Sequence, residues 1–141
     1  MADIALLSGA TGAEPIWPSK AKIKPVVANE TIANGQTAYL ASTGKYGLAD
    51  ANAAGKHQFR GIFLQAAGSG QGTSLLERGA IGGYDVSGMA YDALVYVSDT
   101  AGALSTTAGT ATIVAGRVVP MSDSDLTKVI EIDVNYLADW P

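Results

Sequence analysis

The side chains that could carry out chemistry in this chain are few and lie far apart. His57 is the single histidine, and there is no cysteine. A serine triad would need His57 as its base, but no G-x-S-x-G motif is present to hold a serine nucleophile. Zinc would require an unusual set of carboxylates, because its preferred ligands are thiolates and imidazoles. The sequence therefore predicts that the protein is not an enzyme and uses no cofactor.

Two motifs resemble ligand sites and are interpreted as turns. Counting from Asp123, a calcium loop has glycine at its sixth position and glutamate at its twelfth, whereas this chain has Lys128 and Val134 there. Residues 68–72 have the spacing G-x-G-x-G, but a phosphate loop must open a helix, and the stretch 73–79 is too short for one. We expect a solvated turn near Asp123 and a hairpin loop at 68–72, with no metal or phosphate site.

The elements that must position these residues are expected to be short strands. The chain has 141 residues, of which 48% are hydrophobic and 16% charged, which is typical of one folded domain. Its 17 glycines indicate many turns, one of them at Asn34-Gly35. The sequence predicts an all-β fold, a small antiparallel barrel or a sandwich of short strands with an extended N-terminal arm. The expected strands are 26–33, 36–41, 59–66, 75–81, 84–86, 94–98, 113–121 and 128–135.

Finer features follow from periodicity. In the strand 59–66, Ile62 and Leu64 are expected on one face, and Phe59 and Phe63 on the other, so both faces are covered. Residues 48–55 could form one helical turn.

The chain also contains an internal similarity. The segment from Tyr39 to Gly61 resembles the later segment from Tyr96 to Gly116. We therefore expect the two halves to be versions of one β unit.

Residues 1–25 are predicted to be an extended N-terminal arm, and residues 26–141 a single compact β domain. Prolines at 15, 18 and 25 exclude a long helix or a central strand. In an extended chain Lys20, Lys22 and Lys24 share one face. Two alternatives remain open: the arm lies on another protein, or it packs on its own domain as an edge strand.

The charge of the chain is uneven. Residues 1–70 hold six basic and four acidic side chains, a net charge of +2, and residues 71–141 hold three basic and nine acidic ones, a net charge of −6. The asymmetry indicates either a solvated acidic face or two ends that meet different surroundings.

The sequence also argues against several classes of partner and location. No basic patch interleaved with aromatic residues is present, so nucleic-acid binding is not expected. The sequence contains no run of roughly 18 apolar residues, the length that a membrane-spanning helix would need. The first residues lack a signal-peptide pattern, so synthesis in the cytoplasm is expected.

The order of these features resembles the capsid cement, or head decoration, proteins of tailed bacteriophages. The resemblance covers roughly residues 25–135, and its motifs are turn and strand signatures without catalytic content. They are Ala38-Tyr39-Leu40, Leu48-Ala49-Asp50-Ala51, Gly61-Ile62, Gly79, the stretch 95–104, Gly116-Arg117-Val118 and Lys128-Val129-Ile130.

The resemblance implies a structural virion protein on the outer surface of a capsid, where it stabilises the shell by clamping neighbouring major capsid proteins. It also implies a homo-oligomer, often a trimer, made in the host cytoplasm. The resemblance supplies no motif in residues 1–25, so the contact residues come from the local sequence alone. We expect Ile16 and Trp17 as apolar anchors, and Lys20, Lys22 and Lys24 as charge partners of an acidic capsid patch.

Two other functions fit the sequence. A carbohydrate- or cell-surface-binding β module of a virion would use exposed aromatic side chains on a sheet. Candidates for that role are Tyr39, Tyr46, Tyr84, Tyr91, Tyr96 and Tyr136. The second of these alternatives is a structural domain of a larger secreted assembly. The missing signal-peptide pattern disfavours this alternative.

Overall fold

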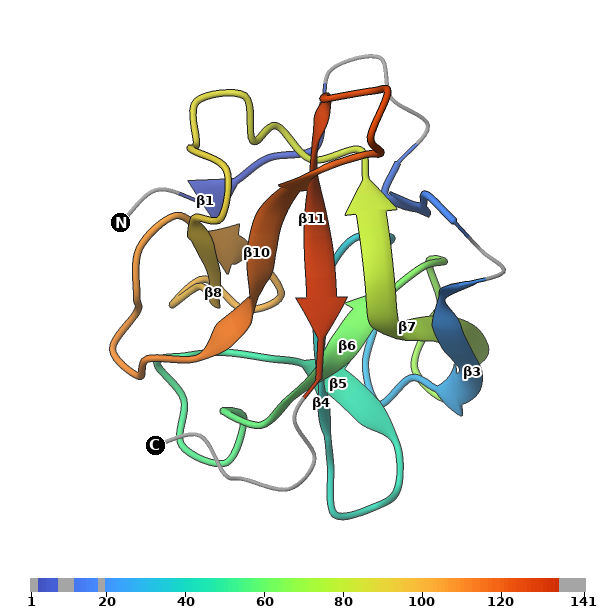
Figure 1. Cartoon of the computed structure of the whole chain (residues 1–141). Helices are drawn as coiled ribbons and strands as arrows, with labels where there is room; N and C mark the ends of the chain where they lie inside the picture. The colour runs from blue at the N-terminus through green and yellow to red at the C-terminus, as the bar shows by residue number, and fades with distance from the viewer. Residues whose placement is uncertain (1–2, 8–11, 18–19, 135–141) are drawn as a thin grey trace.

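A computed structural model describes residues 3–7, 12–17 and 20–134, and this part of the chain is all-β, without a helix (Figure 1). Since no helix occurs in these ranges, none of sufficient length and apolarity to cross a membrane is found there. The all-β prediction is confirmed. The strands are β1 (Asp3–Ile4), β2 (Glu14–Pro15), β3 (Lys22–Val27), β4 (Thr37–Leu40), β5 (Tyr46–Leu48), β6 (Phe59–Phe63), β7 (Gly72–Gly82), β8 (Leu94–Val97), β9 (Leu104–Ser105), β10 (Val114–Pro120) and β11 (Lys128–Asp133).

The strands form one curled antiparallel sheet, in the order β1-β9-β8-β10-β11-β7-β6-β4-β5. The long strand β7 joins its two halves. The first part of β7 pairs with β3 and β6, and the last part pairs with β11 and β2. A strand shared in this way lets a sheet curl around a core without a second, separate sheet.

The predicted internal repeat is visible in the pairing. In the first half, β4 pairs with both β5 and β6, and β6 then pairs with β7. In the second half, β8 pairs with both β9 and β10, and β10 then pairs with β11. Because β7 and β11 pair with each other, the two units meet along this pair.

Each unit carries a bulge at an equivalent place. Gly61 lies opposite Ala38, and Gly116 lies opposite Val95. In both units the register shifts by one residue beside the glycine. A Cβ atom on Gly116 would lie far inside contact distance of the Glu131 carbonyl oxygen, so only glycine fits there.

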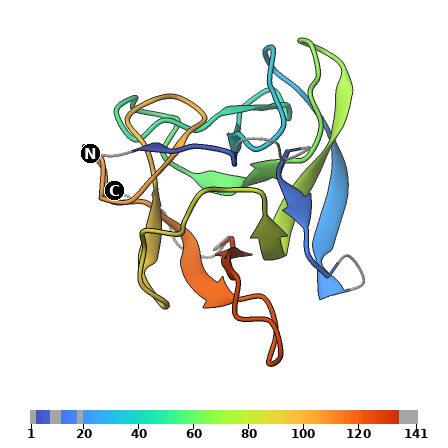
Figure 2. The same cartoon turned by 90° about the horizontal axis from the view of Figure 1, so that it is seen from above.

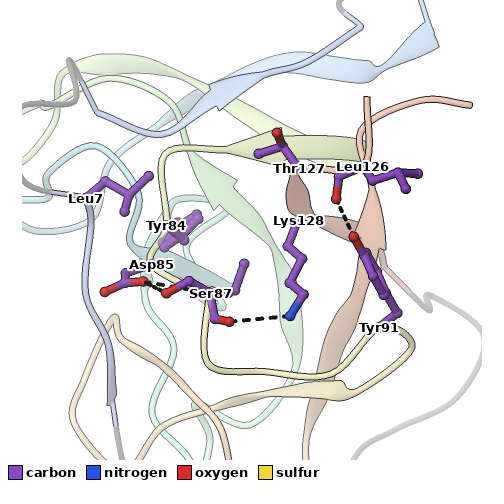
Figure 3. Close-up of a pocket in the computed structure, with 9 residues that line it drawn as sticks. Leu7, Tyr84, Asp85, Ser87, Tyr91, Leu126, Thr127 and Lys128 are labelled. Carbon is purple, nitrogen blue, oxygen red and sulfur yellow. Dashed lines mark hydrogen bonds between the residues drawn. The ribbon is translucent and has the colours of Figure 1, made fainter. Parts of the chain in front are cut away.

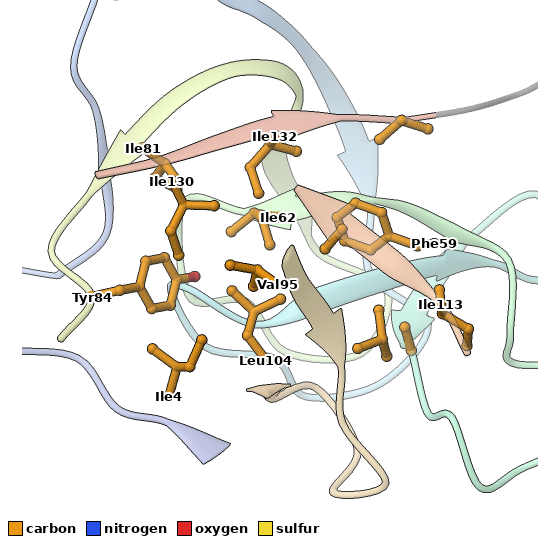
Figure 4. Packing of buried hydrophobic residues seen from close by; sticks show 14 of the residues in the cluster. Ile4, Phe59, Ile62, Ile81, Tyr84, Val95, Leu104, Ile113, Ile130 and Ile132 are labelled. Atoms are coloured by element: carbon orange, nitrogen blue, oxygen red, sulfur yellow. The ribbon is translucent and has the colours of Figure 1, made fainter. Parts of the chain in front are cut away.

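The core forms on both faces of the β6 region, as the sequence predicted. Figure 4 shows the larger of the two clusters. Ile62 and Leu64 share the face of the larger cluster, as predicted, but the prediction that Phe59 shares a face with Phe63 was wrong. Phe59 and Ile62 lie in the larger cluster, while Phe63 packs in the smaller one with Leu75. The bulge next to Gly61 inserts an extra residue, which reverses the alternation between residue 59 and residue 63.

The segment predicted as a separate arm pairs with the domain's own sheet. Strand β1 pairs with β9, and both β2 and β3 pair with β7 (Figure 2). The side chain of Asn34 accepts from the amide of Ala13 at 2.7 Å and donates to its carbonyl at 2.9 Å. The predicted boundary at residue 25 falls inside β3, so the self-packing alternative describes these strands. Backbone groups in an extended segment need partners, and β7 supplies them.

The structure of three connecting segments can be compared with what the sequence predicted for them. Residues 64–71 connect the antiparallel strands β6 and β7, so the glycine-rich stretch is a hairpin loop as expected. Residues 51–55 form hydrogen-bonded turns instead of a helical turn. The strand expected at 84–86 is absent, because Tyr84 makes only an isolated bridge to Leu6.

Candidate functional surface

Trp17 is held at the surface by the last hairpin of the fold. Its side chain is 51% exposed, and its indole N–H donates to the carbonyl of Met121 at 3.1 Å. The preceding residue, Ile16, places its side chain over Gly82, where the missing Cβ leaves space for it. The backbone amide of Ile16 also donates to Ala80 at 2.9 Å. Of the two predicted anchors, Ile16 is therefore largely used within the domain, and Trp17 keeps half of its surface for contact.

The predicted lysines do not act as one group. Lys22 Nζ lies 3.2 Å from Glu77 Oε2, and Lys24 Nζ lies 3.0 Å from Glu77 Oε1. Lys24 also lies over the ring of Tyr46 at 5.4 Å. Both lysines thus neutralise a carboxylate of the same chain, so an acidic capsid patch would have to compete with Glu77. Lys20 is exposed, and its amide donates to the Trp17 carbonyl at 2.9 Å.

Glu77 is a buried carboxylate on β7, with 3% of its side chain exposed. Burial raises its pKa, but the hydrogen bonds and charges of Lys24 and Lys22 outweigh that effect and hold the pKa below its ordinary value. The carboxylate therefore stays ionised at neutral pH and ties β3 to β7. Sequence spacing gave no indication of this contact, because Glu77 is far from the lysines along the chain.

A pocket of about 280 Å³ lies beside the hairpin that joins β10 to β11 (Figure 3). We call this region, together with the hairpin residues 121–127, the hairpin-tip surface. Its most exposed apolar side chains are Leu126, at 64%, and Tyr91, at 47%. The residues lining the pocket are Leu7, Tyr84, Asp85, Val86, Ser87, Tyr91, Leu126, Thr127 and Lys128.

The walls of this pocket are fixed by hydrogen bonds. The Tyr91 hydroxyl donates to the carbonyl of Leu126, and the buried Tyr84 hydroxyl donates to the carbonyl of Gly35 at 2.5 Å. Burial raises the pKa of Tyr84 well above its ordinary value, so the phenol remains a donor. Lys128 Nζ donates to Met89 at 2.6 Å and to Ser87 at 3.3 Å, and it lies 5.2 Å from the Tyr91 ring centre.

The sequence analysis did not select this surface. The available signals were Tyr84 and Tyr91, named only as candidate sugar-binding residues, and Leu126, a large apolar residue in an otherwise Ser- and Asp-rich turn. Its neighbour Asp125 accepts from the Thr127 amide at 3.0 Å and from the Thr127 hydroxyl at 2.7 Å. These bonds lower the pKa of Asp125. Residues 122–127 thus form a solvated turn, as expected.

No cluster of three or more His, Cys, Asp or Glu side chains that could hold a metal ion occurs among residues 3–7, 12–17 and 20–134.

The candidate tyrosines for sugar binding differ in exposure. Tyr39, Tyr46 and Tyr84 are buried, Tyr96 is half-buried, and Tyr91 is exposed. Tyr136 lies outside the described residues.

Comparison with known proteins gives no assignment: no protein-family model matches the chain, and no curated protein matches it.

Proposed function

We propose that this protein is a non-enzymatic structural virion protein that binds the outer surface of a tailed-phage capsid and stabilises it by clamping neighbouring major capsid proteins. The observation that carries the proposal is Trp17, which is half exposed yet fixed by its hydrogen bond to Met121. A rigid aromatic side chain at the surface loses little entropy on binding, as a good interface anchor requires.

Two further features support this function. The resemblance to capsid cement proteins rests on strand and turn residues, and two of the glycines among them, Gly61 and Gly116, lie at bulges of the sheet. A homo-oligomer, such as a trimer, would multiply modest contacts through effective concentration. Clamping would then not require strong binding by any single subunit.

The contacts made within the domain favour some of the proposed contact residues over others. Trp17 and Lys20 remain as candidates, whereas Lys22 and Lys24 bind Glu77, and Ile16 packs over Gly82. The carbohydrate-binding alternative has weaker support. A sugar platform needs a free aromatic face, and Lys128 lies over the ring of Tyr91, the one exposed tyrosine among residues 3–7, 12–17 and 20–134.

The test is saturable binding to expanded tailed-phage capsids that lack a decoration protein, with the thermal stability of the capsid as a second readout. Deleting residues 1–25 is unsuitable, because it removes β1, β2 and part of β3. Trp17→Ala is the sharper variant, and we expect it to weaken binding about 25-fold or more, from the lost burial of half a tryptophan.

Leu40→Ala is the matched control, since Leu40 is 44% exposed and lies next to the β4–β5 turn, away from the β10–β11 hairpin (Figure 1). It should bind like the unchanged protein. Absence of binding to every capsid form would overturn the proposal, and selective binding on a glycan array would favour the carbohydrate alternative.

A further inference from the structure

The hairpin-tip surface has the shape of a socket for a side chain. Its pocket of about 280 Å³ lies just below the range of roughly 300–1,000 Å³ that is typical of small-molecule sites. Leu7, Tyr91 and Leu126 line it and are all exposed. Exposed apolar side chains gathered around one concave site mark an interaction surface more often than scattered ones do.

The socket is also preformed. The Tyr91 hydroxyl binds the Leu126 carbonyl, and the Lys128 ammonium binds the Ser87 carbonyl (Figure 3). The Lys128 ammonium also binds the carbonyl of Met89. The same hairpin is also held at Met121, whose carbonyl accepts from the Trp17 indole. Because these contacts fix the walls before a partner arrives, binding would lose little free energy to ordering.

The charge around the socket is negative. Asp85 lines the pocket and is exposed, and Asp123 is exposed in the hairpin. The one cation of the pocket, Lys128, directs its ammonium group to two backbone carbonyls and the Tyr91 ring. The surface therefore presents carboxylates and apolar groups, and its complement is a positively charged partner with an apolar side chain.

On the basis of the proposed function, we infer that the hairpin-tip surface binds a loop of the capsid protein that inserts an apolar side chain beside a lysine or arginine. This reverses the charge expected from the sequence, in which lysines of this chain were to meet an acidic patch. The apolar side chain fills the space between Leu7, Tyr91 and Leu126, and the cation lies near Asp85.

The test measures the affinity of purified variants for the same undecorated capsids at two salt concentrations. Leu126→Ser should weaken binding about tenfold, because a buried leucine contact is lost. Asp85→Asn should weaken binding about threefold at low salt and less at high salt, because screening reduces the charge attraction. Asparagine can still accept the hydrogen bond from Ser87 that Asp85 accepts at 2.8 Å.

Leu40→Ser and Glu131→Gln serve as controls for the loss of an exposed leucine and of one negative charge elsewhere. Melting temperatures no lower than that of the unchanged protein establish that the variants fold. If the unchanged protein binds capsids but Leu126→Ser and Asp85→Asn match the controls, the inference is wrong and the proposed function stands. If the unchanged protein binds no capsid, both fail.

A second measurement identifies the partner directly. Since the chain has no cysteine, a single cysteine at Ser124 is a unique attachment point for a cross-linker. We expect Ser124→Cys to cross-link to a capsid peptide that contains lysine or arginine, and Ser69→Cys, in the β6–β7 loop, to give no such product. Cross-linking only to acidic or uncharged peptides would contradict the inference.

Discussion

The indole N–H of Trp17 donates to the carbonyl of Met121 at 3.1 Å, joining positions 104 residues apart in the sequence. This bond connects the segment after β2 to the hairpin between β10 and β11. Trp17 is therefore part of the fold and, with half of its side chain exposed, also part of the surface.

Trp17→Phe tests the structural role of that bond. The phenyl ring keeps most of the apolar contact but cannot donate, so we expect a loss of about 0.5–1.5 kcal/mol in the free energy of unfolding. Trp17→Ala should cost more, since it also removes the packing. Urea denaturation gives both values. Equal stability of the phenylalanine variant and the unchanged protein would show that the hydrogen bond contributes nothing.

Glu77→Gln should destabilise the protein, because the buried carboxylate neutralises both Lys22 and Lys24. Both lysines keep access to water, so we expect a loss smaller than the roughly 3–5 kcal/mol of a fully buried ion pair, about 1–3 kcal/mol. Urea denaturation at neutral pH measures the change. A variant as stable as the unchanged protein would show that β3 does not need this carboxylate.

The pH dependence of the Glu77 contribution has a definite sign. Because the folded pKa lies below the ordinary value of 4.5, the stabilisation is fully present above pH 4.5 and is lost as the pH falls through the folded pKa. The difference in stability between the unchanged protein and Glu77→Gln should therefore shrink on acidification. A difference that grows below pH 4.5 would contradict the assignment.

Glu131 should show the opposite behaviour. Burial and the neighbouring Asp133 raise its pKa, partly opposed by Arg78. The folded state therefore binds the proton more readily than the unfolded state, and ionised Glu131 destabilises the fold as the pH rises through this range. Glu131→Gln should be more stable than the unchanged protein at neutral pH, with the advantage disappearing in acid. A loss of stability at neutral pH would refute this.

The bulge glycine can be tested against a nearby glycine without constraints. Gly116→Ala should cost about 3 kcal/mol or more, because the new methyl group would collide with the backbone of β11. Gly88→Ala should be neutral or stabilising by up to about 1 kcal/mol, since nothing lies within 4 Å of its added Cβ. Chemical denaturation of both variants checks the contrast, and a small effect at Gly116 would show that the bulge can relax.

The sequence by itself determined the class of fold, most of the longer strands and the repeat. These features depend on local alternation and on turn residues such as Asn34 and Gly35, whose preferences act over a few residues. Residue Gly35 has the positive φ, 85°, that its turn requires. The short strands β1, β2, β5 and β9 carry too few residues for a periodic signal, and the sequence analysis missed them.

Only the tertiary structure decided where the predicted contact residues point. Nothing local to Lys22 and Lys24 reveals that Glu77 lies across from them on β7, because the pairing joins distant segments. The hairpin-tip surface likewise combines Lys128 of β11 with residues from distant loops that precede β11 in the sequence, among them Leu7 and Tyr91. Ion pairs and pockets depend on positions in space, whereas periodicity reports only which face of its own strand a residue occupies.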